Sequence, residues 1–125
     1  MGPERGDVPR ATVGESTSVE IGPLELKRLI KSGEEVKLID VREAYEYALC
    51  RIEGAELLPL GTVPNAFNDL RHAASQSKLV FYCHHGAKSL RVVNWLRQRG
   101  IAGCLSLKGG IDRWAASVEP GLYRY

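Results

Sequence analysis

The sequence predicts an α/β fold with a mainly parallel central sheet flanked by helices. Short aliphatic runs typical of buried strands alternate with amphipathic segments typical of helices, and the links between them are short. The chain has 125 residues, a size that suits one domain. We expect residues 1–17, rich in Gly, Pro, Ser, Thr and charge, to form a flexible tail and residues 18–125 to form that domain.

The first half of the domain alternates between helix and strand signals. Pro23 suits the first turn of a helix whose leucines lie on one face and which Gly33 ends. Residues 36–39 are β-branched and aliphatic, apart from one lysine, and predict a buried strand that ends at Asp40. The segments that follow are a helical turn or two at 43–49, a strand at 55–58 and a helix at 64–75.

The second half continues the alternation. Residues 79–82 give the clearest strand signal of the chain. Apolar residues at helical spacing then predict a helix at 89–99, which Gly100 ends. A further strand at 104–107 and a last helix at 111–117 complete the expected domain.

Polar residues directly follow two of the expected strands. They are Asp40-Val41-Arg42 and the segment from Cys83 to Lys88. Ligands bind beyond the carboxyl ends of the strands in parallel α/β sheets, so both segments are expected at one edge, where a site would form.

Composition excludes several classes of function. Seventeen Lys and Arg against fifteen Asp and Glu leave a net charge of +2, so we expect neither nucleic-acid nor membrane-surface binding. No signal peptide or long apolar run is present, which favours a cytoplasmic protein that spans no membrane. The three cysteines are widely spaced. This spacing argues against a disulfide framework and against a zinc site. Cys104 is expected to be buried, and Cys50 to be structural or, as an alternative, an exposed resolving thiol.

Cys83 is the candidate nucleophile. It ends a strand and faces the start of the next helix, where unpaired N–H groups and the helix dipole favour a thiolate. Gly86 allows successive N–H groups to turn toward one point and form an anion-binding nest. His84, His85 and Lys88 add donors and positive charge around it. This pattern predicts a nucleophilic thiolate at the floor of a small anion-binding cradle.

Two other readings of the Cys83 loop are weaker. Protein-tyrosine phosphatases place an arginine after five intervening residues, and its planar fork grips phosphate. Here that place is taken by Ser89, preceded by Lys88. A metal site of Cys83, His84 and His85 is also disfavoured, because adjacent residues on one tight loop rarely converge on an ion and no fourth ligand is evident.

Four stretches of the sequence resemble single-domain rhodaneses. They are residues 38–43, residues 51–55, the Cys83 loop and residues 107–114, and together they span roughly residues 23–120. The start of the loop, Cys-His-His-Gly, is also similar to rhodanese modules associated with adenylyltransferases that activate sulfur-carrier proteins. The resemblance implies a single rhodanese-like α/β domain.

The resemblance also implies a sulfurtransferase. Cys83 would take a sulfane sulfur from thiosulfate or a persulfide donor and pass it to cyanide, a thiol or a sulfur-carrier protein. The resemblance gives the persulfide-binding loop as His84, His85, Gly86, Ala87, Lys88 and Ser89. Lys88 stands where many relatives have arginine, so a point charge replaces a bidentate group.

The remaining implications concern support and partners. Asp40 and Arg42 would form a buried or half-buried charge network that supports the loop. No cofactor or metal is implied beyond the covalent persulfide on Cys83, and the partners are a small anionic sulfur donor, a sulfur-carrier protein or a cysteine desulfurase. Alternative functions are a sulfur-relay module without turnover of small donors and a thiol-based phosphatase or arsenate reductase.

Overall fold

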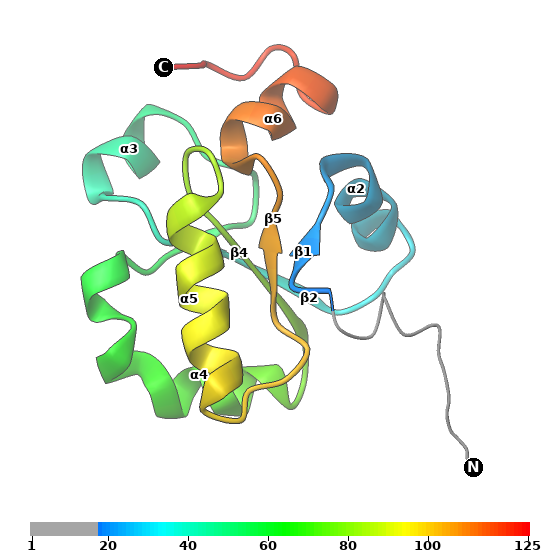
Figure 1. Ribbon diagram of the computed structural model, residues 1–125. Helices are drawn as coiled ribbons and strands as arrows, with labels where there is room; N and C mark the ends of the chain where they lie inside the picture. The colour runs from blue at the N-terminus through cyan, green and yellow to red at the C-terminus, as the bar shows by residue number, and fades with distance from the viewer. Residues whose placement is uncertain (1–17) are drawn as a thin grey trace.

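A computed structural model describes residues 18–125 and shows a five-stranded parallel sheet flanked by helices (Figure 1). The strands lie in the order β1-β5-β4-β2-β3. Their bounds are β1 Glu20–Ile21, β2 Val36–Asp40, β3 Glu56–Leu57, β4 Lys78–Tyr82 and β5 Leu105–Leu107. The predicted α/β class with a parallel sheet is therefore confirmed, while the expected tail at 1–17 lies outside the described residues.

Helices cover both faces of this sheet (Figure 1). Their bounds are α2 Pro23–Lys31, α3 Ala44–Leu49, α4 Phe67–Ala74, α5 Ala87–Gln98 and α6 Gly110–Ser117. Two 3-10 turns, η1 Leu60–Thr62 and η2 Pro64–Ala66, precede α4. None of the helices between residues 18 and 125 is both long and apolar enough to cross a bilayer.

Two hydrophobic cores lie on opposite faces of the sheet, and β4 contributes to both. Leu79 and Phe81 pack in the core that includes residues of α4 and α5, whereas Val80 and Tyr82 pack in the core that includes residues of α2 and α6. Successive side chains of a strand point to opposite faces, so a central strand needs an unbroken apolar run. This burial explains why residues 79–82 gave the clearest strand signal in the sequence.

The structure departs from the sequence prediction mainly in two helix starts and one missed strand. The helix expected at 64–75 begins as the 3-10 turn η2, and only Phe67–Ala74 is α-helical. Helix α5 begins at Ala87, two residues before the expected start, so the last residues of the Cys83 loop form its first turn. Strand β1 was missed, since a pair of residues is too short to show an alternating pattern.

The register of the sheet positions the site. Asp40 pairs with Tyr82 at the ends of β2 and β4, so the chain leaves both strands at the same edge. The predicted meeting of the segment after Asp40 with the segment after Tyr82 is therefore confirmed in the backbone.

Candidate active site

Cys83 follows β4 directly and lies at the N-terminus of α5. Its side chain is buried, with 3% of the residue exposed. The Sγ atom accepts hydrogen bonds from the backbone N–H groups of Gly86 at 3.1 Å and Ser89 at 3.3 Å. Gly86 has a φ of 104°, a left-handed conformation that turns the loop back toward the sulfur. The sequence predicted this cradle, and the donors present in it complement negative charge on a sulfur atom.

Two buried serine hydroxyls lie beneath the cradle. Ser89 Oγ is 3.5 Å from Cys83 Sγ and 2.7 Å from the Oγ atom of Ser106 on β5. The same hydroxyl reaches the carbonyl oxygen of Gly86 at 3.3 Å. Sequence reasoning missed Ser106, whose one weak signal is its polar side chain inside an apolar strand.

The turn into α6 fixes the Cys83 loop from a second side. The N–H group of Ile111 donates to the carbonyl of Cys83 at 2.9 Å, and that of Asp112 donates to the carbonyl of His84 at 3.1 Å. These bonds need close backbone approach at Gly110, whose φ is 64°. A Cβ atom there would come within 2.5 Å of the Cys83 carbonyl oxygen and closer still to that of His84. The helix start thus satisfies loop carbonyls that would otherwise lack partners.

Asp40 and Arg42 form a buried ion pair at the neighbouring strand end. Arg42 Nη2 contacts Asp40 Oδ2 at 2.6 Å, and Arg42 Nε donates to both carboxylate oxygens at 2.9 and 3.1 Å. Arg42 also donates to the carbonyl of Cys50 at 2.6 Å and to the hydroxyl of Tyr125 at 2.8 Å. Burial alone would lower the pKa of Arg42, but the hydrogen bonds with Asp40 and Tyr125 raise it overall. The expected buried charge network is present, and the hydroxyl of Tyr125 is one of its members.

Tyr125 joins this network to the Cys83 loop, and sequence reasoning missed it. Its hydroxyl accepts from Arg42 and donates to Glu46 on α3 at 2.7 Å. Its ring stacks on that of His84, with centroids 3.9 Å apart and planes 7° apart. Burial raises the pKa of the Tyr125 hydroxyl, and the Glu46 carboxylate raises it further. No local signal pointed to Tyr125, because its partners lie far away in the sequence.

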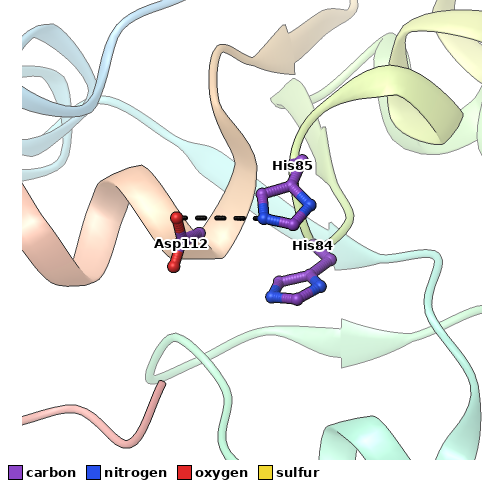
Figure 2. Close-up of side chains that lie close together, drawn as sticks. All are labelled: His84, His85 and Asp112. Carbon is purple, nitrogen blue, oxygen red and sulfur yellow. Dashed lines mark ion pairs between the residues drawn. The ribbon is translucent and has the colours of Figure 1, made fainter. Parts of the chain in front are cut away.

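The charged side chains around the mouth of the loop come from three segments. The ring of His84 stacks between the rings of Tyr125 and His85. The exposed ring of His85 faces Asp112 on α6 (Figure 2). Lys88 is exposed on the first turn of α5, close enough to Glu46 to act on its charge. Partial burial raises the pKa of Glu46, but the hydrogen bond from Tyr125 and the nearby cations lower it overall.

The other two cysteines are buried free thiols. Cys104 is 1% exposed, as expected, and burial raises the pKa of its thiol. Cys50 is 8% exposed, with its sulfur 3.9 Å from Arg42 Nη1. The alternative of an exposed resolving thiol at Cys50 is therefore wrong, because the end of α3 turns this side chain into the core beside Arg42.

Comparison with known proteins assigns the family. The family described as rhodanese-like domain matches residues 22–117, most of the chain. The chain belongs to the rhodanese family. A sulfurtransferase of Allochromatium vinosum is 32% identical over 101 residues, which cover 81% of this chain and 92% of that protein. The relatives of this rhodanese domain thus include sulfurtransferases of similar length.

Other relatives are longer proteins or have solved structures. The probable adenylyltransferase/sulfurtransferase MoeZ of Mycobacterium tuberculosis is 31% identical over 105 residues, 84% of this chain. The match spans about a quarter (26%) of MoeZ. The crystal structure of SSP1007 from Staphylococcus saprophyticus superposes with a TM-score of 0.68 at 30% identity, covering 83% of this chain and 97% of that one. The five-stranded parallel sheet with flanking helices is therefore the rhodanese fold.

Proposed function

We propose that this rhodanese domain transfers a sulfane sulfur through a persulfide on Cys83. The observation that carries the proposal is the sulfur of Cys83, held by two N–H groups at the N-terminus of α5. The Cys83 thiolate attacks the outer sulfur of thiosulfate, and the S–S bond of the donor breaks with its electron pair leaving on sulfite. A nucleophilic acceptor, such as cyanide or a thiolate, then attacks the outer sulfur of the persulfide, and the Cys83 thiolate leaves.

The loop residues take separate parts in this cycle. The backbone N–H groups of the loop from His84 to Ser89 bind the negative charge of the thiolate and of the persulfide. Lys88 attracts the anionic donor as a point charge, and the exposed ring of His85 adds a further donor on the same loop. The step moves sulfur between sulfur atoms of the donor and Cys83, so the cycle closes without a cofactor.

Asp40 and Arg42 act as positioning residues. Neither contacts Cys83 Sγ among the hydrogen bonds of residues 18–125, and Arg42 reaches the loop through Tyr125 and its stack on His84. In the cycle they fix the backbone at this edge of the sheet and, through Tyr125, the position of the His84 ring.

The partners follow from the chemistry and from the relatives. The likeness to the adenylyltransferase/sulfurtransferase MoeZ favours a sulfur-carrier protein as acceptor. As donor we propose a cysteine desulfurase or a small persulfide. In that setting the domain would relay sulfur to a partner protein, and the domain itself would turn over little thiosulfate. The three free cysteines suit a reducing compartment, and we place the protein in the cytoplasm.

The phosphatase or arsenate reductase alternative receives less support. The position that would need a gripping arginine holds Ser89, which is fully buried and hydrogen-bonded to Ser106. Lys88, the neighbouring cation, lacks the planar fork that binds an oxyanion through two parallel hydrogen bonds.

The proposal is tested by thiocyanate formation from thiosulfate and cyanide, together with intact mass after thiosulfate alone. We expect turnover and a gain of one sulfur in the parent protein, both lost in Cys83→Ser and both kept in the matched thiol control Cys50→Ser. A mass gain without thiocyanate would support the relay function. A persulfide that forms equally well in Cys83→Ser, or that fails to form with thiosulfate and with glutathione persulfide, would overturn the assignment.

A further inference from the structure

Two side chains of the active-site loop and one from α6 lie close together. Figure 2 shows the imidazole rings of His84 and His85 on one side and the carboxylate of Asp112 on the other. One potential ligand atom from each residue lies within 4.8 Å of the other two. His85 Nε2 and Asp112 Oδ2 are 3.9 Å apart. The cycle proposed for Cys83 does not require this arrangement.

The backbone brings these residues together before any ligand binds. The N–H group of Asp112 donates to the carbonyl of His84, so the start of α6 is fixed against the loop. Arg124 binds Asp112 Oδ1 at 3.0 Å and leaves Oδ2 toward the histidines.

One polar atom in this arrangement lacks a partner. His84 Nε2 is buried and finds no hydrogen-bond partner among the described residues. Rings of Tyr125 and His85 cover both faces of the His84 ring, so a ligand can reach this side chain only at its edge. A buried polar atom without a partner destabilises the fold. A cation bound at Nε2 would remove that cost, because the neutral imidazole nitrogen carries a free electron pair.

We propose that His84, His85 and Asp112 bind a divalent transition-metal ion of the zinc class. Two imidazole nitrogens and one carboxylate match the ligands of zinc, whereas magnesium and calcium prefer all-oxygen sites. The sequence argued against a site of Cys83, His84 and His85, because adjacent residues on one tight loop rarely converge on an ion and no fourth ligand was evident; the site proposed here uses Asp112 in place of Cys83. Asp112 supplies the third ligand from α6, and a fourth position stays open for water.

Binding requires the exposed ring of His85 to turn out of its stack on His84, because the in-plane electron pairs of two stacked rings point nearly parallel. Zinc holds nitrogen and oxygen ligands at about 2.0–2.2 Å, so the ligand atoms must approach one another by roughly an ångström. The side chains of His85 and Asp112 are 67% and 29% exposed and can rotate without repacking the core. The bound ion would then connect the loop after Cys83 to α6 through side chains as well as through the backbone.

The site is tested by titrating chelator-treated protein with zinc chloride in a calorimeter. We expect one ion per chain in the parent, with affinity lowered about tenfold or more in His85→Ala and in Asp112→Asn, since each removes a ligand. The matched control is His72→Ala, because His72 is the remaining histidine, lies exposed on α4 and is hydrogen-bonded to Gln76. Circular dichroism and melting temperature without zinc verify that each variant is folded.

Cobalt(II) distinguishes this site from a thiolate site. We expect visible bands of a nitrogen and oxygen site, without a thiolate charge-transfer band, and the same spectrum in Cys83→Ser. Zinc should raise the melting temperature of the parent and of His72→Ala but not that of His85→Ala. Absence of binding, equal affinity in His85→Ala, or loss of binding in Cys83→Ser would each overturn the proposal. None of these readouts depends on sulfur transfer, so failure of the metal site and failure of the Cys83 cycle are separable.

Discussion

Tyr125 shows how one side chain connects distant parts of this site. Its hydroxyl bridges the buried Arg42 and the half-buried Glu46, while its ring covers one face of His84. The hydroxyl and the ring therefore have separate partners, one in the charge network and one in the active-site loop. Tyr125→Phe removes the hydroxyl alone and Tyr125→Ala removes both groups, so the comparison of the two variants separates the effects.

We predict that Tyr125→Ala and Tyr125→Phe differ in activity more than in stability. Both lose the hydroxyl bonds and leave Arg42 short of a partner, which should cost about 1–3 kcal/mol of unfolding free energy. Only Tyr125→Ala loses the ring on His84, so only this variant should lower kcat/KM for persulfide formation by about fivefold, equivalent to about 1 kcal/mol. Urea unfolding and rapid-mixing kinetics with thiosulfate measure the two quantities.

The control for Tyr125 is Tyr123→Ala. Tyr123 lies in the same segment and is 59% exposed, so its removal should change neither quantity by more than about 0.5 kcal/mol. Equal kcat/KM values in Tyr125→Ala and Tyr125→Phe would show that the stack on His84 does not position the loop.

At the level of elements, two strand-turn-helix units lie side by side and their turns touch. One runs from β4 through Gly86 into α5, and the other runs from β5 through Gly109 and Gly110 into α6. Strands β4 and β5 are parallel neighbours, so both turns emerge at the same edge of the sheet. A Cβ on Gly86 would lie 3.1 Å from the backbone nitrogen of Gly109, which shows how closely the two turns approach.

The contact between these turns predicts a large effect for Gly110→Ala. A methyl group there would overlap the carbonyls of Cys83 and His84, and the positive φ adds strain of about 1–3 kcal/mol. We expect this variant to lose at least about 1 kcal/mol more unfolding free energy than Gly100→Ala. Gly100 also has a positive φ, of 95°, but a Cβ atom there would meet no residue of the described chain within 4 Å apart from its own neighbours in sequence.

The same pair of glycine variants reports on the active site. Gly110→Ala displaces the carbonyls that Ile111 and Asp112 hold, so persulfide formation measured by intact mass should fall strongly. Gly100→Ala lies at the far end of α5 and should form the persulfide at the parental rate. Equal rates in both variants would mean that the turn into α6 does not shape the Cys83 loop.

The sequence predicted the parts of this site that follow one another along the chain. Cys83, the turn at Gly86 and the start of α5 are contiguous, and a strand followed by a tight glycine turn and a helix has a local signature. Ser106, Asp112 and Tyr125 reach the loop from other elements, and their places depend on how β5, α6 and the last residues pack. Local periodicity carries no information about such packing, so these residues were missed.

At the scale of the whole molecule, the stability of the fold depends on the buried Asp40–Arg42 ion pair. Both side chains are almost fully buried, at 0% and 2% exposure, beneath the edge where the site forms. Two charges removed from water are tolerated because each satisfies the other and because Arg42 has further acceptors at Cys50 and Tyr125. Removal of one partner leaves the other charge buried and uncompensated.

We predict that Asp40→Asn lowers the unfolding free energy by about 3–5 kcal/mol. Loss of an exposed ion pair that also involves β2 should lower it by only about 0–1 kcal/mol. The matched control is Glu56→Gln, which breaks the exposed pair between Lys37 on β2 and Glu56 on β3, 2.7 Å apart. The double variant Asp40→Leu, Arg42→Met should recover much of the loss, because it removes both buried charges together. Urea unfolding of the four proteins decides the case, and a loss in Asp40→Asn no larger than that in Glu56→Gln would mean that water reaches Arg42 and the pair is not a closed part of the core.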